Sequence, residues 1–154
     1  MAITSCLTNT FKEELLQGHH SFNASGDTPA GSAFKIALYT SSATLDTTTT
    51  AYTATNEVAS GGGYTTAGED LTNTGVAKST VTSYTDFSDV SWTSASFTAR
   101  GCLIYNSSTI SGLTTNATVC IIDFGGDKTV SSGTFTIQFP TNDSSDAIIR
   151  ITSS

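Results

Sequence analysis

Histidine is the side chain most often used for acid–base or metal chemistry near neutral pH. It occurs at only two positions of this chain, His19 and His20. Adjacent side chains diverge on most backbones, so a metal ion held here would need further ligands from elsewhere. A serine nucleophile also needs a base, and no serine stands in a G-x-S-x-G turn. We therefore expect a solvated helix end at the histidine pair, and neither a metal ion nor serine–histidine hydrolysis.

Carboxylates are more frequent, but none stands in a complete catalytic motif. Residues 123–127 (DFGGD) begin with a kinase-like triplet, yet the chain has no glycine-rich phosphate loop and no HRD segment. Asp86 with Asp89, or Glu69 with Asp70, could in principle cleave a glycoside, but acidic loop residues of an acidic protein are usually only solvated. We predict that residues 123–127 end a strand and form a turn, and that the protein is not an enzyme and has no cofactor.

The three cysteines, Cys6, Cys102 and Cys120, form an odd set without a C-x-x-C pair. Such a set suits neither a disulfide framework nor a zinc site. Cys102 and Cys120 lie inside apolar strand candidates. Because an unpaired cysteine behaves as a small hydrophobic residue, we expect buried free thiols at these two positions.

Hydroxyl side chains dominate the composition. The 154 residues include 30 threonines and 22 serines, whereas 12% are charged, about half of the usual share. Threonine is β-branched and fits a pleated surface, where its hydroxyl faces water or a cross-strand neighbour. The composition therefore favours a single, strand-rich domain.

The formal charge of −7 results from scarce bases, since the chain has six lysines and arginines and they are scattered. They cannot neutralise a row of phosphates, and no apolar run approaches the roughly 18 residues that span a membrane. We expect neither nucleic acid nor a membrane as a partner, but a neutral or basic protein surface. The first residues do not resemble a secretory leader, so we expect synthesis and use without secretion.

A short helix is expected near the start of the chain. Residues 10–13 (TFKE) match a capping box, and Gly18 is placed to end a helix of about two turns. A helix this short is not stable alone, so the apolar face with Phe11 must dock on the main body or on a neighbouring subunit. We expect residues 1–32 to form an N-terminal arm with this helix and a loop, and residues 33–154 to form the main domain.

The main domain holds about eight strand candidates without helices between them, which predicts an antiparallel β-sandwich of the jelly-roll or immunoglobulin-like type. The strands are expected at residues 33–39, 71–76, 79–87, 90–99, 100–106, 117–124, 133–139 and 146–152. Their apolar positions predict a core that contains Phe34, Ile36, Leu38, Trp92, Leu103, Ile121, Phe135, Ile137 and Ile149.

A long segment between the first two main strands is rich in threonine and glycine. Residues 40–55 include four consecutive threonines, and the three glycines at 61–63 precede Tyr64, which predicts a surface excursion followed by a tight loop. Because neither residues 40–63 nor the arm is expected to bury itself, both are predicted to be mobile contact elements. The predicted interface residues are Phe11, Leu15, Leu16, Tyr52 and Tyr64.

Several segments of the chain resemble a family of small virion proteins encoded by tailed bacteriophages. They are FKIALYTSSATLDTTTTAYTATNEV, GYTTAGEDL, TARGCLIYN, CIIDFGGDKTVSSGTFTIQFP and DAIIRI. The resemblance covers most of the chain, from about Phe34 to Ile151, with the lead-in from Phe11 to Phe22. It differs at Cys102 and Cys120, where small apolar residues would be expected, and at GEDL, which replaces a more glycine-rich stretch.

The resemblance implies a structural component of the particle without catalytic residues. The leading hypothesis is a capsid decoration or cement protein on the outer shell, with the major capsid protein or other virion proteins as partners. We expect a homo-oligomer in the particle, and a protein made in the host cytoplasm and located in the virion. One alternative is a tail or neck component. The other is a carbohydrate-binding receptor module that would stack sugars on Tyr39, Tyr52, Tyr64 and Trp92.

Overall fold

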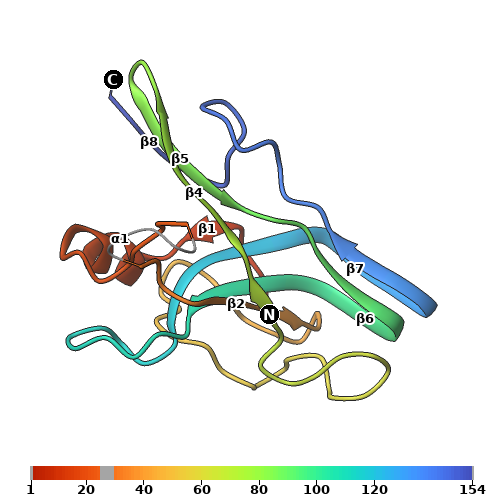
Figure 1. The fold of residues 1–154 in the computed structure, drawn as a ribbon. Coiled ribbons are helices and arrows are strands. Elements are labelled where there is room, and N and C mark those ends of the chain that lie inside the picture. Colours follow the sequence, from red (N-terminus) through yellow and green to blue (C-terminus); the bar gives the residue numbers. More distant parts are fainter. Residues whose placement is uncertain (1, 25–29, 154) are drawn as a thin grey trace.

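The computed structural model describes residues 2–24 and 30–153, and this part of the chain is mostly β-structure, with 49% of residues in strands and one short helix. Its eight strands form two antiparallel sheets (Figure 1), one with the order β1-β7-β6-β2-β3 and one with the order β4-β5-β8. The predicted antiparallel β-sandwich of about eight strands with a short N-terminal helix is confirmed.

The elements follow one another without any helix between the main strands. They are β1 (Cys6–Leu7), α1 (Asn9–Leu16), β2 (Phe34–Tyr39), β3 (Glu69–Leu71), β4 (Asn73–Ser79), β5 (Thr82–Phe87), β6 (Val90–Asn106), β7 (Ala117–Ile137) and β8 (Ile149–Thr152).

Strands β6 and β7 form one long ribbon, although the sequence predicts two separate strands in each. They pair from Asn106 with Ala117 to Val90 with Ile137. Bulges interrupt the ladder, and in the largest of them β7 advances from residue 123 to 128 while β6 advances by two residues. The predicted turn at 123–127 is therefore wrong, because these residues are a bulge inside β7.

The bulges allow the ribbon to fold back over itself. Phe124 and Phe135 both lie on β7, and eleven residues of straight strand would span roughly 36 Å. Their ring centroids are nevertheless 6.3 Å apart. On β6, Trp92 and Phe97 are also in ring contact, at 6.4 Å. The β6–β7 ribbon thus contributes to both layers of the sandwich.

Strand β2 is buried on both faces. As its alternation predicts, Phe34, Ile36 and Leu38 face the main core. On the other face, Ala37 and Tyr39 belong to a second core that the sequence pattern did not reveal. The cover over that face comes from the segment that follows β2.

The excursion at residues 40–63 provides that cover. Ala43 and Leu45 are 1% and 2% exposed and fill the second core. Polar side chains form hydrogen bonds in the turns around these two residues. Asp46 Oδ1, for example, accepts hydrogen bonds from the amide and the hydroxyl of Thr48, at 2.8 and 2.6 Å. The expectation that this segment cannot bury itself is wrong, because a few well-placed apolar residues suffice.

The predicted tight loop at residues 61–63 packs against a bulge of β6. All three glycines have positive φ, and a Cβ added to Gly62 would lie 2.3 Å from the carbonyl oxygen of Ser96. The amide of Ser96 donates to the Gly62 carbonyl at 2.8 Å. Only glycine permits this approach of two backbones, which brings Tyr64 into the core.

The N-terminal segment packs into the same core as the main sheets. Strand β1 pairs with β7, and Phe11 on α1 is fully buried. The helix begins after Thr8, whose hydroxyl accepts from the Phe11 amide at 3.4 Å and donates to the Thr118 carbonyl at 2.9 Å. The predicted cap at Thr10 is therefore wrong by two residues, and the expectation of an arm that cannot bury itself is also wrong.

The predicted core is confirmed at seven of nine positions, which are at most 4% exposed: Phe34, Ile36, Leu38, Trp92, Leu103, Ile121 and Ile149. Phe135 and Ile137 are only half-buried. They lie on the part of β7 beyond its pairing with the two-residue β1, so one side of the sandwich is open there.

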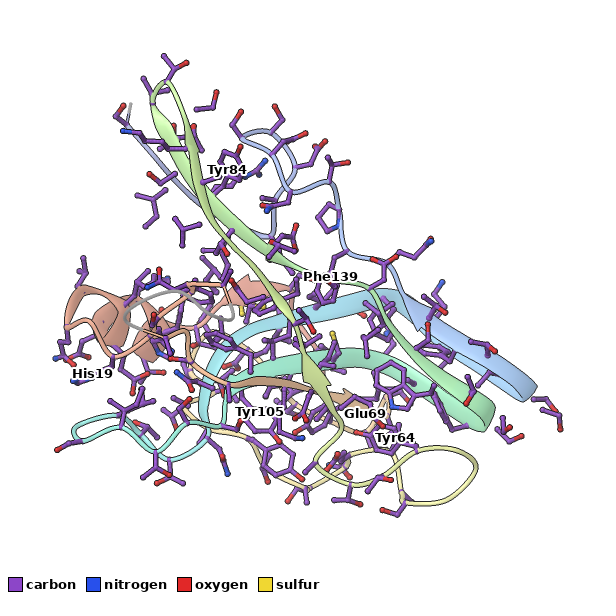
Figure 2. The ribbon with its side chains drawn as sticks, in the orientation of Figure 1. His19, Tyr64, Glu69, Tyr84, Tyr105 and Phe139 are labelled. Atoms are coloured by element: carbon purple, nitrogen blue, oxygen red, sulfur yellow. The ribbon has the colours of Figure 1, made fainter. Side chains whose placement is uncertain are left out.

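The smaller sheet has a buried base and an exposed end. Thr85, Asp86 and Phe87 at the end of β5 are buried, whereas most of β4 and β8 is exposed. Figure 1 shows the β4–β5 hairpin and β8 projecting from the body. We call residues 76–84 with 150–152 the distal lobe. Figure 2 shows Tyr84 on it.

Candidate functional site

The five predicted interface residues do not form one surface. Phe11 and Tyr64 are 0% and 2% exposed and belong to the main core, so they cannot contact a partner of the folded chain. Leu15 and Tyr52 are half-buried. Only Leu16, which is 91% exposed, is fully available.

The aromatic platform proposed for sugar stacking is also absent. Tyr39, Tyr64 and Trp92 are at most 2% exposed. The half-buried Tyr52 stacks on Tyr105 of the same chain, with ring centroids 4.8 Å apart. Three of the four side chains are therefore closed to a sugar, and one face of Tyr52 is covered by Tyr105.

The tyrosines are instead organised around a buried carboxylate, Glu57. Its Oε1 accepts from Tyr64 Oη at 2.6 Å and from the Ala67 amide at 2.8 Å, and its Oε2 accepts from Tyr52 Oη at 2.6 Å. Tyr64 Oη in turn accepts from the Leu38 amide at 2.9 Å. Through Tyr64, the Glu57 carboxylate thus links the segment that follows β2 to β2 itself.

Burial is the main cause of raised pKa values in this cluster. It raises the pKa of Tyr39, Tyr52 and Tyr64 above the ordinary tyrosine value, and it raises the pKa of Tyr105 to about 12, with a further contribution from Glu57. The phenols therefore stay protonated at neutral pH and act as permanent donors. The cluster is suited to a structural role and not to proton transfer.

A second buried network joins Glu14 on α1, His20 and Asn106 at the end of β6. Glu14 Oε2 lies 3.1 Å from His20 Nε2, and Asn106 Nδ2 lies 3.1 Å from His20 Nδ1. The Thr114 amide donates to Glu14 Oε1 at 3.2 Å. The Ser108 amide donates to Asn106 Oδ1 at 2.9 Å, which leaves Asn106 Nδ2 to donate to His20 Nδ1. His20 is therefore neutral, with its proton on Nε2.

The solvated helix end expected at the histidine pair is wrong for His20, which is 6% exposed. Burial is the largest effect on the imidazole of His20 and lowers its pKa. The hydrogen bond to Glu14 and the charge of Glu14 raise this pKa, but the net shift is downward. Both ring nitrogens are engaged within the chain, so His20 has no free nitrogen for a metal ion or a substrate. Sequence reasoning missed this network because Asn106 is distant in the chain and belongs to no motif.

The first pair of candidate glycosidase carboxylates is held by backbone amides. Asp86 is fully buried, its oxygens accept from the amides of Phe87 and Ile148 at 2.8 and 3.2 Å, and burial raises its pKa. Asp89 is exposed, and its Oδ1 accepts from the Phe139 amide at 2.9 Å. By accepting these hydrogen bonds, Asp86 and Asp89 hold the segments that connect the strands in place.

The other carboxylate candidates are surface ion pairs or solvated side chains. On β3, Glu69 and Asp70 are exposed, and Asp70 pairs with Lys35 Nζ at 2.6 Å. In the kinase-like triplet, Asp123 accepts from Arg100 Nε at 2.9 Å, and this hydrogen bond lowers the pKa of the carboxyl. None of these groups is placed as an acid–base pair over a common hollow.

All three cysteines are free, and Cys102 and Cys120 are buried as predicted. Burial raises the pKa of Cys102 well above its ordinary value, and it raises the pKa of Cys120 to about 12. Buried thiols that stay protonated are inert as nucleophiles and as metal ligands. They therefore serve as small hydrophobic residues of the core.

The open side of the sandwich forms an apolar groove of about 680 Å³ along β7. Its apolar walls are Ile122, Phe124, Phe135, Ile137, Phe139 and Ile148, all half-buried, and we call it the β7 groove. Figure 2 shows Phe139 at the end of β7, close to the base of the distal lobe. The groove has the size of a ligand site, but it lacks convergent buried polar groups that would orient a small molecule.

The distal lobe combines exposed apolar side chains with positive charge. Val76, Val81 and Ile151 are 59%, 58% and 61% exposed. Lys78 and Arg150 are its only charged residues, so it carries +2 while the remainder of the chain, at −7 overall, carries −9. The charge of the lobe is thus opposite in sign to that of the whole chain.

Comparison with protein-family models, with curated proteins and with solved structures finds no match to this chain. Within residues 2–24 and 30–153, no helix is long and apolar enough to cross a membrane. The same residues contain no group of three or more histidine, cysteine or acidic side chains that could hold a metal ion.

Proposed function

We propose that this chain is a structural protein of a tailed-bacteriophage particle, and specifically a decoration or cement protein that binds the outer surface of the capsid. The position of the apolar surface supports the proposal. An open groove on β7 and a projecting lobe with three exposed apolar side chains offer contacts to other proteins. The buried carboxylates Glu14, Glu57 and Asp86, in contrast, are bonded within the chain.

Under this proposal, the partners are the major capsid protein or other virion proteins, together with further copies of the chain. The protein is made in the host cytoplasm and functions in the virion. The resemblance of several segments to small virion proteins of tailed bacteriophages supports this assignment. A rigid β-sandwich that places its contacts on the outside suits a part that is repeated over a shell.

Localisation on purified particles tests the proposal. Antibodies raised against the purified chain would be applied to particles of the phage that encodes it, and gold-labelled secondary antibodies would be located by electron microscopy. We expect label over the outer face of the capsid and peptides of the chain in the mass spectrum of the particles. Label confined to the tail or neck would replace decoration with the tail or neck alternative, and absence from the particles would overturn the virion role.

A further inference from the structure

The loop 107–116, which connects β6 to β7, is anchored at both ends by side chains that bond His20. At its start, the Ser108 amide donates to Asn106 Oδ1 at 2.9 Å. Near its end, a second amide of the loop donates to Glu14 Oε1 at 3.2 Å. Asn106 and Glu14 occupy the two ring nitrogens of His20, each at 3.1 Å. The imidazole thus lies between the two anchors of the loop.

The side-chain amide of Asn106 satisfies both of its neighbours in one orientation only. Its oxygen must face the Ser108 amide, which is a donor, so its nitrogen faces His20 Nδ1 and donates to it. The reverse orientation would place the oxygen at the ring, but the nitrogen would then meet the Ser108 N–H, donor against donor. The network therefore fits a ring whose Nδ1 carries no proton.

Protonation of the imidazole places a hydrogen on both ring nitrogens. The hydrogen on Nε2 keeps its acceptor, Glu14 Oε2. The hydrogen on Nδ1, in contrast, points at the donor group of Asn106. A buried donor without an acceptor is costly, so the charged ring draws the oxygen of Asn106 toward itself, and the bond from the Ser108 amide is lost.

Two charged groups act on His20 within the described part of the chain. They are Glu14 on α1, whose charge favours the imidazolium, and His19, whose charge opposes it. The loop 107–116 contains no titratable side chain, and β5 contributes Tyr84 to a hollow that His20 lines. Because the carboxylate of Glu14 contacts the ring at Nε2, a proton on Nδ1 depends on the side chain of Asn106 for its acceptor.

Protons reach His20 although the ring is buried. Phe11 and Phe22 pack against the ring, with centroids 5.0 and 6.5 Å from it. His20 also lines a hollow of about 400 Å³ between residues 15–23 and the distal lobe. This hollow gives the ring a route for protons that does not require unfolding.

We propose that His20 is an acid-sensitive latch for the loop 107–116: its protonation turns the side-chain amide of Asn106 toward the ring and releases the amide of Ser108. The loop then loosens beyond Ser108, whose hydroxyl still accepts from the Ala33 amide at 2.8 Å. Most of the residues beyond the released amide are exposed, so acid changes the surface that this end of the molecule presents. The inference does not depend on the proposed location in a particle.

Nuclear magnetic resonance of the ¹⁵N-labelled chain between about pH 7.5 and about pH 4.5 tests the latch. At the upper pH, the ring nitrogen resonances should show the proton of His20 on Nε2. As the pH falls, the amide resonance of Ser108 should shift with the same midpoint as the ring, and ¹⁵N relaxation should show increased motion over residues 109–113. A Ser108 amide that does not follow the ring, or a neutral ring with its proton on Nδ1, would overturn the proposal.

Asn106→Asp tests the conflict between the two donors. A carboxylate keeps one oxygen for the Ser108 amide and offers the other to a protonated Nδ1, so it satisfies the charged ring. We expect His20 to bind its proton at least about tenfold more tightly than in the wild type, and the Ser108 amide to keep its environment throughout the titration. A ring that titrates as in the wild type would contradict the role assigned to Asn106.

His20→Gln is the matched control for the ring. A glutamine amide offers a donor and an acceptor, as the neutral imidazole does, but it does not bind a proton in this pH range. We expect the Ser108 amide and the loop 107–116 to be insensitive to pH in this variant. If the loop still loosens with the wild-type midpoint, another group is responsible and the latch is refuted. These readings need no phage particles, so their failure is distinct from failure of the proposed capsid location.

Discussion

At the scale of single residues, the titratable side chains that invite a catalytic interpretation are occupied by structural bonds. Glu57 holds three donors, and Asp86 caps two backbone amides. Glu14 and His20 form a closed network with Asn106. Buried polar groups of this kind cost several kcal/mol if left unpaired, so loss of one partner should appear in stability and not in any activity.

Tyr64→Phe tests this interpretation at Glu57. The change removes one hydrogen-bond donor to the Glu57 carboxylate and the acceptor for the Leu38 amide. We therefore expect the free energy of unfolding, measured by urea titration, to decrease by about 1.5–3 kcal/mol. Tyr84→Phe, on the half-exposed face of the lobe, is the matched control and should change stability by less than about 0.5 kcal/mol. Similar effects of the two variants would contradict a structural role for the cluster.

The buried His20 should make the free energy of unfolding depend on pH. Its pKa is lowered in the folded chain, so the unfolded chain binds the proton more strongly. As the pH falls through about 6.5, the ordinary pKa of histidine, the unfolded state gains a proton that the folded state lacks. The free energy of unfolding therefore decreases. The decrease ends once the pH is below the folded pKa.

Urea titrations between about pH 7.5 and about 5.5 measure this effect. We expect His20→Gln to be less stable than the wild type at the upper pH and to lose much of the slope between the two pH values. His19→Gln removes only a minor cause of the lowered pKa of His20, so it should change the slope less than His20→Gln does. If the slope survives in His20→Gln, another group is responsible for it.

At the scale of elements, the helix α1 is a part of the core and not an attachment arm. Phe11 is fully buried, whereas Leu16 on the same helix is 91% exposed. We expect Phe11→Ala to reduce the free energy of unfolding by about 3–5 kcal/mol and Leu16→Ala to change it by less than about 0.5 kcal/mol. Denaturant titrations compare the two, and a small effect of Phe11→Ala would restore the arm as a detachable element.

The elements that could be predicted from sequence are those with local signals. The alternation in 33–39 located β2, and the break between the predicted strands 79–87 and 90–99 correctly separated β5 from β6. Phe135 has the same alternation, yet its burial depends on whether another strand closes the sandwich, and none does there. The length of β6 and β7 was missed because bulges at Ser94 and Gly125 resemble turns in the sequence.

The sites were harder to predict, because they depend on contacts between distant segments. Tyr64 was expected at an interface, but the approach of Gly62 to β6 turns it inward. The threonine-rich excursion was assigned to the surface from its composition, although Ala43 and Leu45 are enough to seal it onto β2. The sequence of the distal lobe, in turn, contains few features that would tell an exposed sheet from a buried one.

At the scale of the whole molecule, stability should be distributed unevenly. The five-stranded sheet is covered on both sides by two cores, and α1 and β1 pack into it. The distal lobe has neither cover, since β4 and the end of β8 are exposed. Elements with few buried apolar contacts open locally at low free-energy cost, so the lobe should be the least protected β-structure in the monomer.

Hydrogen exchange followed by mass spectrometry tests this gradient. We expect peptides from β4 and β8 to exchange fastest among the strands. Peptides from β2, from residues 100–106 of β6 and from α1 should exchange most slowly, because they open only with the core. Rapid exchange of α1, or protection of β4 and β8 equal to that of β2, would contradict this gradient.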